Sequence, residues 1–201
     1  NMPSDLTDLT KDEYKGLYQL HNLGGGTAKT VFASIISRYQ DPDGDLGISD
    51  EGWEIAAKFL GNAHNIADGE DAVGSVINGT YPMDEHWASG VLTEQKDRDY
   101  KFQIMTPDIG EPYVVESLAI SAGTKKYDTC VAFLNWLGSS DVQLDWSNNY
   151  GTIPCQKEAL DQVSDDIKEL METLKPQDLD WSFIAENVDA WVEKAELEYV
   201  Q

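Results

Sequence analysis

Three consecutive glycines, Gly24 to Gly26, separate a short apolar run at residues 16–20 from a segment whose apolar side chains recur at helical spacing. This order predicts a strand, a tight turn and the N-terminus of a helix. Glycines permit a sharp turn and leave the backbone open to a ligand. The first amides of a helix have no partner inside that helix and lie at the positive end of its dipole. The turn, with Thr27 after it, is therefore a candidate site for an anionic or polar group.

A flexible connector is the alternative interpretation of the same stretch, because glycine runs are common in loops. The stretch lacks the Gly-Lys-Ser/Thr ending of a nucleotide P-loop, since Lys29 follows Ala28, and it does not match GxGxxG. Nucleotide binding is therefore poorly supported. Lys29 stands one turn into the expected helix and could assist an anion, although a solvated lysine is the simpler interpretation.

The charge of the chain excludes some classes of partner. The 201 residues carry a formal net charge of −23, with 37 acidic against 14 basic side chains. Phosphate backbones and anionic lipids are bound by clustered Lys and Arg, so neither nucleic acid nor an anionic membrane surface is an expected partner. Cys130 and Cys155 are too few for a disulfide framework, and two free thiols are favoured over one bridge.

Strands alternate with helices along most of the chain, which predicts an α/β fold with helices packed on a mixed central sheet. Residues 5–15 form a polar, turn-rich lead-in rather than a helix. The helix that begins near Ser49 or Asp50 is expected to bury Trp53 and Phe59. Further helices are expected at residues 71–77, 84–95, 125–137, 160–174 and 184–199, and strands at residues 80–83, 101–105 and 113–121.

No catalytic constellation is found. The histidines, His21, His64 and His86, do not form an HExxH pattern, and there is no Gly-x-Ser-x-Gly elbow. No catalytic residue and no cofactor are predicted.

An acidic loop after the first expected helix resembles the start of a calcium loop. Asp41, Asp43 and Asp45 occupy the first, third and fifth positions of such a loop, which supply oxygen ligands to calcium. The glycine then comes one place late at Gly47 and the closing glutamate one place early at Glu51. A solvated acidic turn is therefore favoured over calcium binding.

Polar and aromatic residues follow an expected strand at residues 80–83. Glu85 and Trp87 lie where α/β proteins place ligand-binding side chains, although Trp87 could instead pack in the core at a helix start. Tyr150 precedes Gly151 in an expected loop, where it either contacts a ligand or only packs. Both interpretations stay open for each residue.

The order of these features resembles the extracellular solute-binding proteins of ABC importers, with the type 2 periplasmic binding fold, and within them the ferric-iron, thiamine, polyamine and phosphonate group. The resemblance covers most of the chain. It rests on Asp8-Leu9-Thr10 with Tyr14-Lys15-Gly16, Gly25-Gly26-Thr27, the helix of Trp53, Val76-Ile77-Asn78-Gly79, Thr106-Pro107-Asp108-Ile109-Gly110, Leu118-Ala119-Ile120-Ser121 with Gly123-Thr124-Lys125, Ala132-Phe133-Leu134-Asn135-Trp136-Leu137 with Ser140-Asp141-Val142-Gln143, and residues 151–154.

The resemblance implies two lobes that close over a small polar or anionic solute and deliver it to a membrane permease. Residues 1–112 and 150–201 would form the second lobe, and residues 113–149 a returning segment of the first, whose N-terminal part would be missing. It implies a bacterial extracellular, cell-surface lipoprotein or periplasmic location, and self-association of such a fragment.

The resemblance implies three sets of ligand residues. They are the residues of the glycine turn, the segment that follows Tyr81, and Tyr150 itself. Ferric-binding members typically show adjacent tyrosines near Tyr150, whereas Gly151 follows it here, which argues against iron held by paired phenolates. The binding residues predicted in full are Gly24, Gly25, Gly26, Thr27, Glu85, Trp87 and Tyr150. A metal-dependent hydrolase and a surface interaction module without a small ligand are the alternatives.

Overall fold

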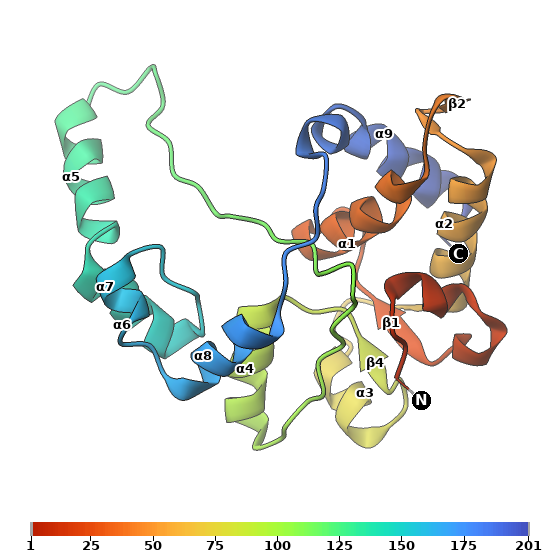
Figure 1. The fold of residues 1–201 in the computed structure, drawn as a ribbon, viewed down its shortest axis with the longest axis horizontal. Coiled ribbons are helices and arrows are strands. Elements are labelled where there is room, and N and C mark those ends of the chain that lie inside the picture. Colours follow the sequence, from red (N-terminus) through yellow and green to blue (C-terminus); the bar gives the residue numbers. More distant parts are fainter. Residues whose placement is uncertain (1, 201) are drawn as a thin grey trace. The chain divides into compact units, whose positions relative to one another are not determined.

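The computed structural model describes residues 2–200, and these form two compact units (Figure 1). Within the described residues, unit 1 comprises residues 2–86, 103–112 and 176–200. Unit 2 comprises residues 87–102 and 113–175. Residues 113–149 therefore group with residues 87–102 and 150–175 in one compact unit. Their assignment to a lobe stays a prediction.

Unit 1 is built on a small parallel sheet with strand order β3-β1-β4. Tyr18 pairs with Met83, and Gln19 pairs with both Asp84 and His64. Its strands are β1 (Tyr18–Leu20), β3 (His64–Asn65) and β4 (Met83–Asp84). The short β1 is fully buried, as is usual for a central parallel strand. The predicted α/β class is confirmed, in a sheet whose described pairings are parallel.

Three helices of unit 1 pack on one another and carry most of its core (Figure 1). They are α1 (Gly26–Ile36), α2 (Asp50–Asn62) and α9 (Trp181–Glu198). Phe32, Ile36 and Trp191 are completely buried. The predicted start of α2 is confirmed, because Ser49 caps it by accepting a hydrogen bond from the Gly52 amide, and its predicted apolar face is buried. The shorter elements of this unit are η1 (Leu6–Thr10), η2 (Asp12–Tyr14), η3 (Ser37–Tyr39), β2 (Gln40–Asp45) and α3 (Ala72–Asn78).

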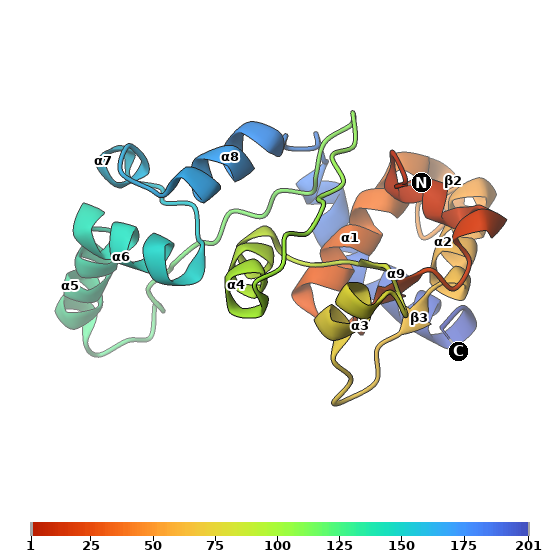
Figure 2. The ribbon, with the colours of Figure 1, turned by 90° about the horizontal axis from the view of Figure 1, so that it is seen from below.

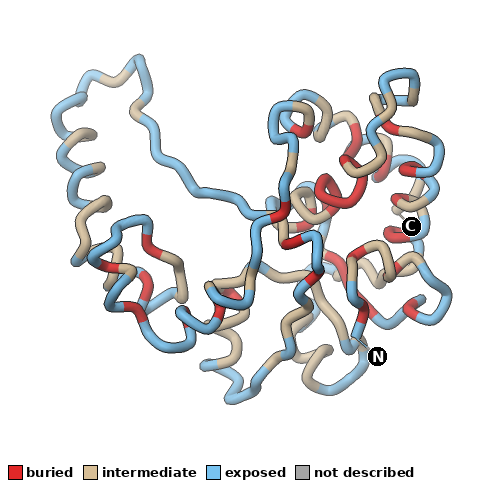
Figure 3. The backbone as a smooth tube through the Cα atoms, viewed as in Figure 1, coloured by how far each residue is buried: buried red, intermediate tan, exposed pale blue. Residues whose placement is uncertain are grey.

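Unit 2 is helical and has fewer buried side chains than unit 1 (Figure 3). Its helices are α4 (Ala88–Arg98), α5 (Tyr127–Leu137), α6 (Ser140–Tyr150), α7 (Lys157–Leu160) and α8 (Asp165–Thr173). Helix α6 contacts α5 and α7, which Figures 1 and 2 show from two directions. Helix α5 occurs where it was predicted, yet Phe133 and Trp136 are more than half exposed. Cys130 and Cys155 are free thiols.

Several expectations from the sequence are wrong. The strands expected at residues 101–105 and 113–121 are irregular segments, because no strand lies beside them in the described chain to accept their backbone hydrogen bonds. The helix expected from Asp84 begins at Ala88, since Asp84 is still paired in β4.

The N-terminal segment is more ordered than expected. Residues 6–14 form two 3-10 helices, with Leu6, Leu9 and Tyr14 buried. Asp5 caps the first helix by accepting a hydrogen bond from the Thr7 amide, and its own amide donates to Asp8. The sequence signal for this helix is the spacing of Leu6 and Leu9, which lie one turn apart and so share a buried face. Across residues 2–200, no helix combines the length and hydropathy that a membrane crossing requires.

Candidate functional site

Polar side chains gather where β1 and β4 end. The two strands run parallel with Gln19 opposite Asp84, so His21 and the segment Glu85–His86 leave the sheet at the same edge. This is the carboxyl edge of a parallel sheet, where α/β proteins characteristically place their ligands. His21, Glu85 and His86 therefore come together, although more than sixty positions of the chain separate His21 from the other two.

His21, Asp84 and His86 each offer one potential ligand atom, and these atoms all lie within 4.8 Å of one another. The Nδ1 atom of His86 is 3.7 Å from Oδ2 of Asp84, and the two imidazole centroids are 6.4 Å apart. The side chain of Asp84 is only 7% exposed. Within the described part of the chain, buried Oδ1 of Asp84 and buried Nε2 of His21 have no hydrogen-bond partner.

Glu85 adds a buried carboxyl group to this edge. Burial raises its pKa to about 8, the hydrogen bond from the His21 amide opposes that rise, and the neighbouring charge of Asp84 adds to it. The His21 amide donates to Oε1 of Glu85 at 3.2 Å. At neutral pH the carboxyl group is mostly protonated, so Glu85 can offer a donor as well as acceptors. Its part in ligand binding stays a prediction.

The glycine turn lies at the surface of unit 1, with Gly24, Gly25 and Gly26 all exposed. The Gly24 amide donates to Oδ1 of Asn22 at 2.7 Å, and the Gly25 amide donates to the Asn22 carbonyl at 2.8 Å. Gly25 is the N-cap of α1 and provides no side-chain cap. The amides left for a ligand are therefore those of the first helical turn, beginning with Gly26 and Thr27.

Lys29 is engaged within unit 1. Its Nζ atom lies 3.0 Å from Oδ1 of Asp189 on α9, so the lysine is held by an ion pair at the surface of the helix. The simpler of its two interpretations, a surface lysine, fits this contact.

The aspartates of the calcium-like segment lie on strand β2. Asp41, Asp43 and Asp45 belong to β2, and Oδ1 of Asp41 accepts a hydrogen bond from the Asp43 amide. Asp45 pairs with Lys194 at 3.0 Å. In residues 2–200, these three carboxylates do not form a group with all ligand atoms within 4.8 Å, as His21, Asp84 and His86 do.

Trp87 and Tyr150 belong to unit 2, and both are more than half exposed. Trp87 is the N-cap residue of α4 and is not in a core, and its ligand role stays a prediction. Tyr150 ends α6, with its ring centroid 5.1 Å from that of Trp146, and Gly151 then adopts a left-handed conformation that ends the helix.

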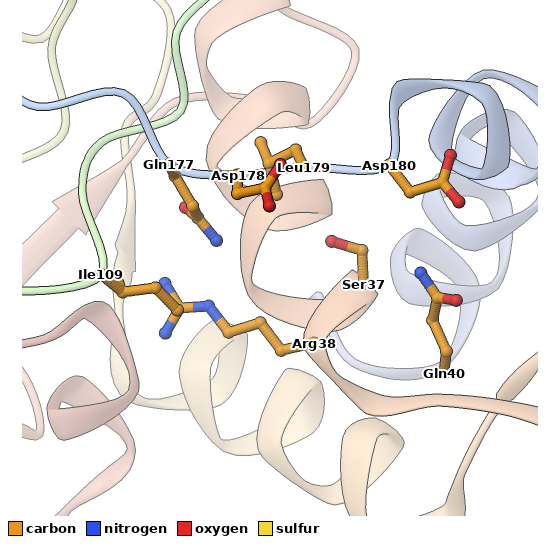
Figure 4. A pocket seen from close by; sticks show the side chains of 8 residues that line it. All are labelled: Ser37, Arg38, Gln40, Ile109, Gln177, Asp178, Leu179 and Asp180. Atoms are coloured by element: carbon orange, nitrogen blue, oxygen red, sulfur yellow. The ribbon is translucent and has the colours of Figure 1, made fainter.

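A separate, open pocket of about 460 Å³ lies elsewhere in unit 1 (Figure 4). The guanidinium of Arg38 lies beside it, but its Nη1 atom already donates to both carboxylate oxygens of Asp5, at 2.7 and 3.0 Å. The pocket is lined by Ser37, Arg38, Gln40, Ile109, Gln177, Asp178, Leu179 and Asp180. Because Nη1 of its one arginine is taken up by Asp5 and only Nη2 lacks a hydrogen-bond partner in the described chain, we favour the sheet edge over this pocket.

Comparison with known proteins gives the family. Residues 1–175 match the bacterial extracellular solute-binding proteins. The chain is also 33% identical over 199 residues to a probable ABC transporter periplasmic-binding protein of Sinorhizobium fredii, covering 99% of this chain and 55% of that protein. The chain therefore belongs to the bacterial extracellular solute-binding family, as the resemblance predicted. It spans about half the length of the curated relative that it matches.

Solved structures agree on the fold. A ferric binding protein from Campylobacter jejuni matches with a TM-score of 0.77 and 21% identity, over 98% of this chain and 64% of that one. An apo ferric ion-binding protein A from Pasteurella haemolytica matches with a TM-score of 0.78 and 18% identity, over 100% of this chain and 64% of that one. These likenesses confirm the type 2 periplasmic binding fold.

Proposed function

We propose that the chain is part of the solute-capture component of an ABC import system, and that it works outside the cytoplasmic membrane. The match of residues 1–175 to extracellular solute-binding proteins carries this proposal. The Sinorhizobium relative is a probable ABC transporter periplasmic-binding protein, and this likeness supports a permease at the membrane as the partner.

The solute in this proposal is small and polar or anionic. The open amides of the first turn of α1 suit an oxygen-rich group. His21 and Glu85 add groups that can donate or accept hydrogen bonds at the sheet edge. The net charge of −23 disfavours a highly charged anion, so a solute that also carries donors or a cation fits better.

Capture in this proposal is non-covalent and leaves the solute chemically unchanged. The ligand holds two lobes closed because it binds the closed state more tightly than the open state. The lobe assignment implied by the resemblance, with residues 1–112 and 150–201 in one lobe and 113–149 in the other, is part of the same proposal. Self-association of a chain that spans half of its relative also remains part of it.

A thermal-shift screen tests this function. The full chain is screened against phosphonates, sugar phosphates, polyamines, thiamine and ferric complexes, and each hit is titrated by calorimetry and recovered for analysis. We expect one class to bind saturably and to be recovered intact. Recovery of a hydrolysed product would instead favour the metal-dependent hydrolase.

The glycine turn is tested with Gly26→Leu. A Cβ atom built at Gly26 meets nothing within 4 Å, so the chain should fold while the side chain covers the first amides of α1. Gly61→Leu is the matched control. A Cβ atom built at Gly61 also meets nothing within 4 Å, and Gly61 lies at the C-terminal end of α2, away from the amides of a helix N-terminus. We expect the hit to bind at least about tenfold more weakly to the Gly26 variant only. Equal affinity in both variants would remove the turn from the site.

A further inference from the structure

We propose that His21, Asp84 and His86 form a binding site for a divalent transition-metal ion of the zinc class at the carboxyl edge of the sheet in unit 1. This inference rests on the proposed function, because the ion would bridge the protein and an oxygen atom of the captured solute. The three ligand atoms come from two segments that the parallel pairing of β1 and β4 holds at one edge.

The geometry is close to what such an ion requires. Ligands about 2.1 Å from a tetrahedral zinc ion lie about 3.4 Å from one another. The observed ligand atoms lie within 4.8 Å of one another, and His86 Nδ1 and Asp84 Oδ2 are 3.7 Å apart. Small rotations of side chains on a fixed sheet edge would therefore complete the site.

The burial of Asp84 is the second, independent observation. Only 7% of its side chain is exposed to solvent, and its Oδ1 atom has no hydrogen-bond partner in the described chain. A buried carboxylate is costly unless it is paired or coordinates a metal. Nε2 of His21 is buried and unpartnered as well. A cation between these groups would satisfy both of them.

The donor set selects the class of ion. Two imidazoles and one carboxylate suit zinc, cobalt, nickel and copper, whereas calcium takes six to eight oxygen ligands. Three protein ligands leave a coordination position for water or for an oxygen atom of the captured solute. The formal net charge of −23 attracts cations to the whole surface, so the site would work in a favourable field.

His64 provides an internal comparison. Its Nε2 atom lies 2.8 Å from Oε2 of Glu70, and its ring stacks on Tyr81 with centroids 4.2 Å apart. It belongs to the same unit but not to the cluster. Replacing His64 therefore removes a histidine without removing a proposed ligand.

The test is a titration of the metal-free full chain with Co²⁺, followed by visible absorption, and then competition with Zn²⁺. We expect one Co²⁺ per chain with a tetrahedral-type spectrum that Zn²⁺ displaces and millimolar Ca²⁺ does not. His21→Gln and His86→Gln should each weaken binding at least about tenfold, and His64→Gln should leave it unchanged. Asp84→Asn keeps the shape of Asp84, and circular dichroism confirms that each variant is folded.

Binding that is equally weak in the wild type and in the His21 and His86 variants, or that Ca²⁺ displaces, would mean an adventitious ion only and would overturn the proposal. The solute screen is repeated in excess chelator. Solute binding that persists there without any specific Co²⁺ site leaves the proposed capture function standing while the metal site fails. Failure of both assays rejects both.

Discussion

Glu111 should make the stability of unit 1 depend on pH. Burial raises its pKa to about 7 from an ordinary 4.5, the charge of Asp5 adds to the rise, and Arg38 opposes it. A raised carboxyl pKa means that the folded chain holds the proton more tightly than the unfolded chain. The resulting stability is complete below about pH 4.5 and is lost as the pH rises through about 7.

The magnitude follows from the difference between the two pKa values. A change from 4.5 to about 7 corresponds to a ceiling of about 3 kcal/mol. Glu111 is only half-buried, so solvent screens part of this, and we expect about 1–2 kcal/mol. Glu111→Gln mimics the protonated form and should be more stable than the wild type by this amount at about pH 8.5, yet equal to it at about pH 4.

Urea unfolding at the two pH values, followed by circular dichroism and tryptophan fluorescence, measures the difference in the free energy of unfolding. Glu54→Gln, at an exposed position of α2, is the control and should change stability at neither pH. A Glu111 variant that matches the wild type at about pH 8.5, or that is less stable there, would refute the reasoning.

Three further substitutions test the packing of unit 1. Trp191→Ala should cost about 3–5 kcal/mol in urea unfolding, because the ring is completely buried and its Nε1 donates to the Leu46 carbonyl at 2.9 Å. A loss below about 1 kcal/mol would mean that the ring is not in the core. Asp180→Ala should lower the free energy of unfolding by about 1 kcal/mol, because the Asp180 side chain caps α9 by accepting hydrogen bonds from two amides. Thermal unfolding followed by the helical circular dichroism signal measures this loss as a lower melting midpoint. Arg38→Met should cost about 2 kcal/mol at neutral pH, because it leaves the half-buried Asp5 without its arginine, and a double variant with Asp5→Asn should recover part of the loss.

The helices that the sequence predicted well are those whose periodicity and caps agree. Helix α2 has Ser49 as its cap and its apolar face at helical spacing, and both are local signals. The capping of residues 6–10 by Asp5 was equally local, but the polar composition of the segment hid the buried Leu6 and Leu9. β-branched content predicted a strand at residues 113–121, where Val114 and Val115 are instead exposed in an irregular segment.

The site could be predicted only in part. Its position after an expected strand drew attention to Glu85, which lies at the sheet edge. His21 and His86 were visible as residues, but their proximity depends on the pairing of Gln19 with Asp84, a long-range register that periodicity does not encode. The exposure of Gly24, Gly25 and Gly26 agrees with the predicted turn whose backbone is open to a ligand. Its hydrogen bonds to Asn22, which occupy two of its amides, could not be foreseen from composition.

Capture of a small solute without chemical change is the function proposed for the chain. Native mass spectrometry of the full chain with the screened compounds tests this most directly, because it counts bound molecules and reports their mass. The account predicts a saturable complex with one solute molecule of unaltered mass, weakened by Gly26→Leu and not by Gly61→Leu. Absence of any saturable complex across the panel, with and without zinc, or a bound species whose mass shows bond cleavage, would contradict it.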